Sequence, residues 1–228
     1  MDIAVFLGQS LQLDAARMLL PQATFYPPLS ADSLEWLADA PHTHYLVIDG
    51  DFEPGCLIDD DLIRKRVEYG GQWYGAAGFG AYLASQLSVV GFRGLGLVFD
   101  AYNTNAISGW EDVARAYDTD FSPLNDSLYS IRCTVAHAYK TGVISRFFAI
   151  ELILQTVEQV YYRRDFQAIA AAVAVHYGDM GEDFLNWLAQ HGVNNIEQID
   201  VIDALRHIAI QWKAISMQSA VVSTVEPV

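Results

Sequence analysis

The sequence predicts an α/β fold with a mostly parallel β-sheet, flanked by helices and followed by an all-helical C-terminal region. Three observations support this expectation. In the first half of the chain, short apolar runs alternate with helix-patterned segments; strand signals disappear after about residue 120; and the remaining residues carry helical periodicity. Because parallel strands are joined by right-handed crossovers, the first half should be Rossmann-like in the broad sense, with helices on both faces of its sheet.

The expected strands are short apolar runs that end at turn signals, and the helices between them begin at capping or acidic residues. Ser10 would cap the first helix, and Ser30 or Asp32 the second. The acidic residues 59–61 would begin the third helix, where they complement its dipole. We expect strands at residues 3–8, 23–28, 45–48, 73–78 and 95–102.

The C-terminal part of the chain contains a series of helical runs separated by glycine or aspartate, and Gly192 is an expected helix end. We therefore divide the chain into an α/β core at residues 1–120, a helical region at 121–215 and a tail at 216–228. The tail lacks a clear period, which indicates a flexible segment or a strand that docks on a partner. The helical runs lie at 125–142, 144–165, 166–179, 182–192 and 196–215.

The composition indicates a compact globular protein with an acidic surface. Apolar residues make up 52% of the 228 residues and charged residues 18%, the opposite of the balance in disordered chains. The net charge of −15 would repel nucleic acid and anionic membranes, and it favours a basic peptide or a basic face on a partner protein. No apolar run approaches the ~20 residues of a membrane-spanning helix, and the N-terminus lacks the basic segment of a secretion signal. We therefore expect a cytoplasmic protein in which Cys56 and Cys133 stay reduced.

A ligand site is expected beyond the carboxyl ends of the strands, where open parallel sheets bind their ligands. Asp49 is the most suggestive residue, since a single carboxylate at a strand end can act as a base or position a polar ligand, and Ser10 follows the first strand. The alternative makes Asp49 a turn residue in the segment IDGD and Ser10 a helix cap. The other residues expected to line this cleft are Gly8, Gln9, Pro27, Pro28, Gly50, Gly75, Gly78, Phe79 and Gly80.

The segment GAAGFGAYLASQL, residues 75–87, indicates a turn between a strand and a helix. Its AAGFG portion has the spacing of the G-x-S-x-G nucleophile elbow, with Gly78 where the nucleophilic serine would stand. Glycine offers no oxygen for covalent catalysis, but the amide N–H groups at the start of the following helix could form an anion or oxyanion site. The alternative is close packing of strand and helix, which also requires small residues.

Other polar residues carry weaker signals. His42 and His44 lack a cluster of carboxylates or cysteines beside them, so we expect no metal site, and we assign no cofactor. Cys56 could be a thiol nucleophile, although the acids at 59–61 would raise its pKa. Arg132 and the segment YYRRD at 161–165 could place cations over the cleft or form ion pairs on helix surfaces.

Taken together in their order and spacing, several segments between residues 3 and 166 resemble the TfuA-like family. The set of segments carries the resemblance, rather than any one motif. The segments are VFLGQSL, FYPPLSADSLEWL, LVIDGDF, YGAAGFGAYLASQL, GFRGLGLVFDAY and WEDVARAY, followed more faintly by IRCTVAHAYKTGVIS and VYYRRDF. The individual positions that match the family pattern are Ser10, Pro27, Pro28, Asp49 and Gly50.

The chain departs from the family pattern at residues 75–87, where the family usually has a G-A-S-S-M-G-A-L-R-A-A-E-L type segment. The glycine and alanine framework is retained, whereas both serines, the arginine and the glutamate are absent. An acidic D-D-E-V-A segment of the family is matched only in part, by a segment that begins with Glu111 and Asp112. The residues that replace the family's four polar side chains are Ala77, Gly78, Leu83 and Gln86.

The resemblance implies a partner role. Members of this family assist YcaO enzymes, which use ATP to activate a backbone amide of a ribosomally made precursor peptide and convert it to a thioamide. The resemblance also implies release of sulfide from a thiocarboxylated sulfur-carrier protein, for which the family serine would be a natural nucleophile. Because that serine is missing, we favour an accessory protein with weak or no chemistry of its own. The alternatives are a hydrolase that uses Asp49 with Ser10 or a bound water, and an anion- or small-molecule-binding module.

Overall fold

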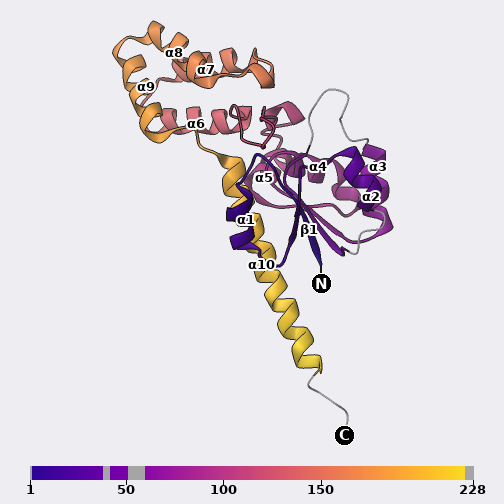
Figure 1. The fold of residues 1–228 in the computed structure, drawn as a ribbon. Coiled ribbons are helices and arrows are strands. Elements are labelled where there is room, and N and C mark those ends of the chain that lie inside the picture. The colour runs from indigo at the N-terminus through magenta and orange to yellow at the C-terminus, as the bar shows by residue number, and fades with distance from the viewer. Residues whose placement is uncertain (1, 38–41, 51–59, 224–228) are drawn as a thin grey trace.

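The computed structural model describes residues 2–37, 42–50 and 60–223. Its centre is a five-stranded sheet with the strand order β2-β1-β3-β4-β5, in which every neighbouring pair is parallel (Figure 1). Helices flank the sheet, so the predicted Rossmann-like α/β class is confirmed. The strands are β1 (Ile3–Phe6), β2 (Thr24–Tyr26), β3 (His44–Val47), β4 (Gln72–Gly75) and β5 (Arg93–Gly94).

Alternate residues of the strands face two separate apolar cores, one on each side of the sheet. Ile3 and Val5 of β1 share one core with α1 and α10, whereas Ala4 and Phe6 share the other with α2 to α5. The sheet is thus covered on both faces, as the continuous apolar sequence of β1 predicts. The covering helices are α1 (Leu13–Leu19), α2 (Ala31–Trp36), α3 (Asp60–Tyr69), α4 (Phe79–Leu87), α5 (Gly96–Asn103) and α10 (Ile196–Ser223).

Residues 95–102, which we expected as the fifth strand, instead form most of helix α5, and β5 consists of only two residues. The helix begins there because Asp200 caps it: its carboxylate oxygens accept hydrogen bonds from the N–H groups of Leu97 and Val98, each at 2.8 Å. An apolar run of this length does not distinguish a strand from a helix. The deciding cap lies about a hundred residues further along the chain, beyond the reach of a local pattern.

Helices α6 to α9 form a stack beyond the carboxyl edge of the sheet (Figure 1). They surround a third apolar core, which includes Phe148 and Phe184. Ser127, Ser145 and Asp165 cap the starts of α6, α7 and α8 by accepting backbone hydrogen bonds. The bounds are α6 (Leu128–Lys140), α7 (Arg146–Val157), α8 (Phe166–Ala174) and α9 (Asp179–His191), with short 3₁₀ segments η2 (Ser88–Val90), η3 (Trp110–Asp112), η4 (Tyr161–Arg163) and η5 (Val175–Tyr177).

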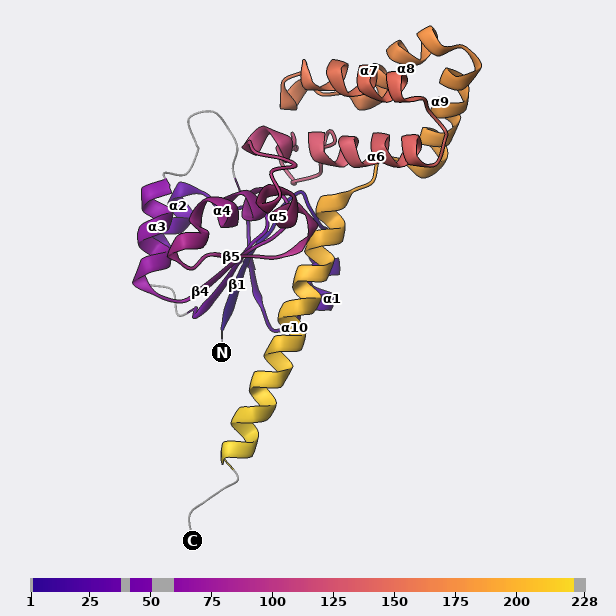
Figure 2. The same cartoon turned by 180° about the vertical axis from the view of Figure 1, so that it is seen from behind.

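Helix α10 returns from this stack to the α/β core, where it packs along α1 and α5 (Figure 2). Its first turns carry two buried acids, Glu197 and Asp200. Glu197 accepts hydrogen bonds from the hydroxyls of Ser127 and Ser130 at the start of α6, while Asp200 caps α5. These two carboxylates therefore fasten α10 both to the helical stack and to the α/β core.

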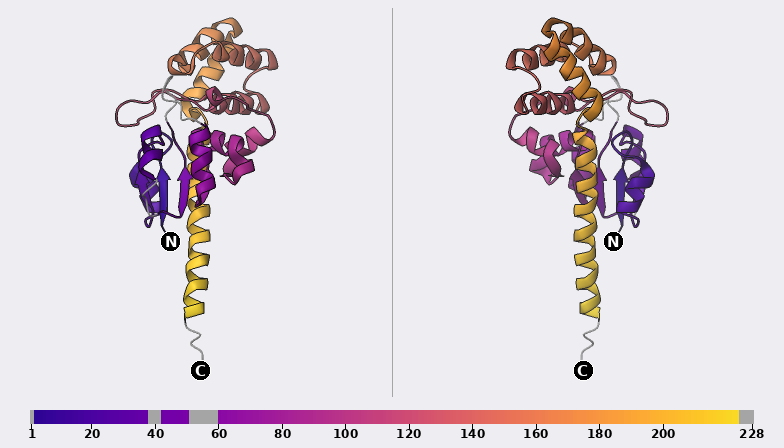
Figure 3. Two further views of the ribbon diagram at one scale, coloured as in Figure 1. Left: turned by 90° about the vertical axis from the view of Figure 1, so that its right-hand side faces the viewer. Right: turned by 90° about the vertical axis from the view of Figure 1, so that its left-hand side faces the viewer.

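The far end of α10 extends past the sheet as a single helix as far as Ser223 (Figure 3). The tail expected from residue 216 is therefore helical through residue 223. Residues 201–208 of α10 share an apolar core with the strands, so part of the expected helical region packs on the α/β core. The domain boundary that we placed near residue 120 stays a prediction. Among the helices in the described part of the chain, none combines the length and apolarity needed to cross a membrane.

Candidate functional site

The strand order changes direction between β1 and β3, and sheets of this order bind ligands beyond the carboxyl ends at that point. The loop after β1 meets Asp49, which follows β3. The Asp49 Oδ2 atom accepts hydrogen bonds from the backbone N–H of Gly8 at 2.8 Å and of Ser10 at 3.2 Å, and Oδ1 accepts one from the Ser10 hydroxyl at 2.6 Å. The structure thus brings Gly8, Ser10 and Asp49 into direct contact.

The Asp49 carboxylate is buried, and both of its oxygens accept hydrogen bonds. Asp49 is 1% exposed and Ser10 is 3% exposed. Burial raises the pKa of Asp49, while the hydrogen bonds from Ser10 and Gly8 and the positive charge of Arg115 act in the opposite direction. With three donors on its two oxygens, the carboxylate holds the loop after β1 against β3. A base or a nucleophile must reach its substrate, and neither side chain is open to one in this conformation.

Arg115, which sequence analysis did not single out, covers this site from the side of the helical stack. It is 3% exposed, and its Nη2 donates a hydrogen bond to the carbonyl oxygen of Gln9 at 2.7 Å. Its Nη1 lies 3.4 Å from Asn195 Oδ1. Gln9, a predicted cleft residue, is thus held through its backbone. The sequence carries no local signal for this role of Arg115, because its acceptor is a backbone carbonyl.

The predicted cleft residues Pro28, Gly50 and Phe79 form the packed walls of this site. A Cβ atom on Gly8 would lie 2.5 Å from Pro28 Cγ, and one on Gly50 would lie 2.0 Å from the Phe79 ring. Beside these contacts, a cavity of about 240 Å³ is lined by Gly8 and Pro27 together with residues of the loop around Asp120. The cleft predicted from the strand ends is therefore narrow, and its glycines allow close packing.

The turn between β4 and α4 is built on two close backbone contacts. A Cβ atom on Gly75 would lie 2.0 Å from the carbonyl oxygen of Gly80, and one on Gly80 would lie 1.8 Å from the carbonyl oxygen of Val47. Real side chains do not tolerate such distances, so both positions require glycine. These contacts let α4 pack directly on β3 and β4, which supports the packing alternative for this segment.

The strained residue of this turn is Ala77 rather than Gly78. Ala77 has a φ of +58°, in the left-handed region that non-glycine residues adopt infrequently, and Gly78 has an ordinary φ of −63°. The tip of the turn therefore lies one residue earlier than we expected. Counting the elbow pattern from Gly75 instead of Ala76 would have placed its third residue at Ala77, the position of the first family serine.

Gly78 has room for a side chain, unlike its neighbours. Among the described residues beyond its chain neighbours, the one atom within 4 Å of a Cβ at this position would be the carbonyl oxygen of Val113, at 3.8 Å. No described residue accepts a hydrogen bond from the backbone N–H of Ala77 or Gly78. Backbone donors beside open space are what an anion or oxyanion site needs, so such a site at this turn stays a prediction.

The predicted residues Glu111, Asp112 and Arg132 lie in a second cluster. Asp112 Oδ1 accepts a hydrogen bond from Arg132 Nη1 at 2.7 Å, and its Oδ2 accepts from the N–H groups of Ser108 and Gly109. Glu111 is exposed. Because Asp112 and Arg132 neutralise each other, neither is free to bind a ligand by charge in this arrangement.

Arg164 belongs to this second cluster but lacks such a partner. It is 3% exposed, and its Nε and Nη1 atoms are buried without a hydrogen-bond partner among the described residues. Burial lowers the pKa of Arg164 to about 10; the Asp112 charge raises it and the Arg132 charge lowers it further. The segment YYRRD thus supplies one buried cation, in place of the surface ion pairs that we weighed.

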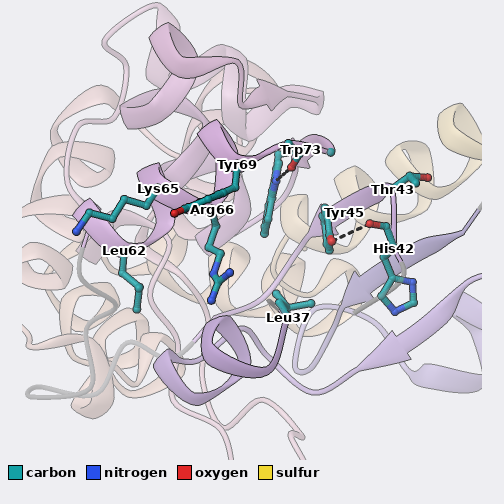
Figure 4. Close-up of a pocket in the computed structure, with 11 residues that line it drawn as sticks. Leu37, His42, Thr43, Tyr45, Leu62, Lys65, Arg66, Tyr69 and Trp73 are labelled. Atoms are coloured by element: carbon teal, nitrogen blue, oxygen red, sulfur yellow. Dashed lines mark hydrogen bonds between the residues drawn. The ribbon is translucent and has the colours of Figure 1, made fainter. Parts of the chain in front are cut away.

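His42 and His44 lie at the opposite, amino edge of the sheet. The His42 Nε2 atom is 2.7 Å from the Tyr26 hydroxyl, and the His44 ring is in edge contact with Trp212. His42 also lines a cavity of about 720 Å³ between α3 and the starts of β3 and β4, with Trp73 in its wall (Figure 4). This cavity is remote from the carboxyl edge and is not part of the candidate site.

The described residues include one of the two cysteines. Cys56 lies outside the described residues. Cys133 on α6 is partly exposed, and burial raises the pKa of its thiol, which disfavours the reactive thiolate. Within the described ranges, no group of three or more His, Cys, Asp or Glu side chains is placed to hold a metal ion.

Comparison of the sequence with known proteins identifies a family. A family model described as TfuA-like protein matches residues 49–165, just over half of the chain. The match begins at Asp49 and includes the turn before α4, the Asp112–Arg132 pair and Arg164. Residues 3–48, whose segments also resemble the family, lie outside it. A search of curated proteins finds no match. The chain belongs to the TfuA-like family.

Proposed function

We propose that this protein is an accessory protein that binds a YcaO-type enzyme and assists it in forming thioamides in the backbone of a ribosomally synthesised peptide. Family membership supports a partner-protein role. The observation that carries the proposal is an exposed apolar surface on α7. The YcaO partner and the thioamide product are what the family resemblance implies.

One side of helix α7 is apolar and open to solvent. Phe147 is 78% exposed, Ile150 45%, Leu154 58% and Val157 49%. These residues are three or four positions apart, so they lie on one side of the helix, and we call them the α7 apolar face. Helix α7 stands on the far side of α6 from the sheet (Figure 1). A contiguous apolar face that stays exposed to solvent is typical of a protein-binding surface.

A groove between α6 and α7 adjoins this face. It has a volume of about 370 Å³, and its walls are apolar residues of both helices, including Val135, Ile150 and Leu154. Arg132 and Arg146 also line it. Because Arg132 is paired with Asp112, Arg146 supplies the positive charge beside this groove, and in a chain with a net charge of −15 it favours a partner segment that combines apolar and acidic residues. We assign this segment to the YcaO-type protein.

The contact between Ser10 and Asp49 is the observation that favours the alternative function, a hydrolase that releases sulfide from a thiocarboxylated sulfur-carrier protein. A hydroxyl that donates to a carboxylate at 2.6 Å resembles a nucleophile beside its base. Both groups are buried, however, and the turn before α4 has no side-chain oxygen at Ala77 or Gly78. The accessory role therefore ranks first.

Co-purification with a YcaO-type enzyme tests the accessory role. Replacing two residues of the α7 apolar face, Ile150→Glu with Leu154→Glu, should weaken association at least ~100-fold, because two charges would enter an apolar interface. Val175→Glu is the matched control: Val175 is also an exposed apolar residue, but it lies on η5, outside the face. The rate of thioamide formation by the enzyme, measured with each variant, should follow the order of association.

Three results would change this assignment. Failure of the unmodified protein to associate with any YcaO-type enzyme or to change its turnover would remove the accessory role. Equal loss of association in the double variant and in Val175→Glu would leave the role intact and move the interface away from α7. Sulfide release by the purified protein alone would favour the hydrolase.

A further inference from the structure

The cavity of about 720 Å³ at the amino edge of the sheet is a second place where this protein can hold a ligand (Figure 4). Its described lining comes from the end of α2, from α3 and from the segments that begin β3 and β4. It lies at the opposite edge of the sheet from Asp49 and from the helical stack (Figure 1). A volume of this size is within the range of sites that hold small organic molecules.

The described lining of this cavity is positively charged, although the chain as a whole is acidic. Lys65 and Arg66 are its two cations, and no aspartate or glutamate is among the described lining residues. Three acids of the neighbouring segments, Asp2, Asp61 and Glu68, do not belong to that lining, and the two on α3 are exposed. In a chain with a net charge of −15, a small anion would therefore meet a locally favourable charge here.

Arg66 is the cation that points into the cavity. Figure 4 shows its side chain extending from α3 toward Leu37, while the Lys65 side chain points away. The one described acceptor of Arg66 is the carbonyl oxygen of Glu35, 3.4 Å from Nη2, and Arg66 forms no ion pair with a described residue. Burial raises the pKa of Tyr45, and the positive charge of Arg66 acts in the opposite direction. Because a guanidinium has five N–H groups, most of those on Arg66 are left for water or a ligand.

Aromatic and apolar side chains surround this guanidinium. Tyr45 and Trp73 are buried and stack on each other, with ring centres 4.2 Å apart and 16° between their planes, so they form a fixed wall. Tyr69 also lines the cavity but is 86% exposed. An aromatic ring this exposed gains little from the core of the protein, and it offers a surface that a flat apolar group can cover. The cavity thus combines a cation with apolar walls.

We propose that this cavity binds a small organic anion with a flat apolar body, whose acidic group contacts Arg66 and whose body lies against Tyr69. Carboxylate and phosphate share this chemistry, because each can accept two parallel hydrogen bonds from the fork of a guanidinium. Lys65 distinguishes the two, since its flexible side chain brings a second positive charge, which a doubly charged phosphate uses more than a carboxylate does. The site is separate from the α7 apolar face, and it does not rest on the proposed partner role.

Calorimetric titration of the full chain with four probes tests this proposal. 2-Naphthoate and 2-naphthyl phosphate carry both an anion and a flat body, 2-naphthamide has the body without the charge, and inorganic phosphate has the charge without the body. At least one naphthyl anion should bind at least ~10-fold tighter than both 2-naphthamide and inorganic phosphate. The tighter of the two naphthyl anions shows whether the acidic group is a carboxylate or a phosphate.

Variants of α3 show whether Arg66 is the partner of the anion. Arg66→Met should weaken binding of the tighter naphthyl anion at least ~10-fold, and Arg66→Lys, which keeps the charge but loses the fork, should fall between. Arg64→Met is the matched control, because Arg64 lies on the same helix but does not line the cavity, and it should change affinity less than ~2-fold. Tyr69→Ala removes an exposed ring and should weaken binding by ~3- to 10-fold.

Several outcomes would overturn the proposal: neither naphthyl anion binds, 2-naphthamide or inorganic phosphate binds as tightly, or Arg66→Met and Arg64→Met behave alike. The comparison of the four probes uses the unmodified protein, so it holds even if a variant fails to fold. Urea denaturation of each variant separates a loss of binding from a loss of stability.

Discussion

Arg115 and Arg164 are equally buried, at 3% exposed each, but they stand in different surroundings. Arg115 lies where the loops after β1 and β3 meet, donates to the Gln9 carbonyl and faces the Asp49 carboxylate. Arg164 lies beside η4 and donates to no described residue. In the first region both buried charges have partners, whereas in the second region Arg164 has no hydrogen-bond partner among the described residues.

This difference bears on the stability that each arginine contributes to the fold. Buried polar groups that satisfy one another hold the backbone in place, and removing one leaves the others unpaired. A buried charge that no described residue satisfies contributes little to stability, because its lost hydration is not replaced. The region around Asp49, which sequence patterns favoured as a site, is held together by hydrogen bonds, whereas two buried nitrogens of Arg164 have no acceptor among the described residues.

The largest effect is expected from Gly80→Ala, which would disturb the close contact between α4 and β3, the strand that Asp49 follows. The added Cβ would lie 1.8 Å from the Val47 carbonyl oxygen, so α4 must move away from β3, and we expect a loss of at least ~3 kcal/mol in the free energy of unfolding. Gly78→Ala is the control, since the nearest atom to its Cβ is 3.8 Å away. That variant should change stability by less than ~1 kcal/mol. Urea denaturation measures both, and equal losses would show that the turn does not depend on this contact.

The general architecture was predictable because it depends on local patterns. Apolar runs of four residues, turn residues after them and helical periodicity were enough for the parallel sheet and for the convergence of Gly8, Ser10 and Asp49 at one edge. Helix α5 was not predictable in the same way. Its start depends on the carboxylate of Asp200, about a hundred residues away in sequence.

The features of the site that were missed are also non-local. Whether an arginine in YYRRD is buried or exposed depends on how η4 packs against η3 and the loop before α6, which these five residues do not specify. The partner of Arg115 is a backbone carbonyl, and backbone acceptors carry no sequence signal. The strain at Ala77 required the register of the turn, which the alternating small residues of GAAGFG leave ambiguous by one position.

Arg115→Met should have the next largest effect, because it removes the cation from the satisfied region. The Gln9 carbonyl would lose its donor, and Asp49 and Asp126 would lose a neighbouring positive charge. We expect the free energy of unfolding to fall by ~2–4 kcal/mol. Urea denaturation at pH 7 measures this loss. A change within ~0.5 kcal/mol in the free energy of unfolding would show that Arg115 contributes as little to stability as we expect of Arg164.

Arg164→Met should have the smallest effect on stability, although it removes the same side chain from an equally buried position. Methionine fills most of the volume of the arginine stem and carries no charge that must lose its water, so the free energy of unfolding should change by less than ~1 kcal/mol or increase. The same denaturation experiment, with Arg115→Met beside it, measures the contrast directly. Equal and large losses in the two variants would mean that Arg164 has a partner in the folded chain after all.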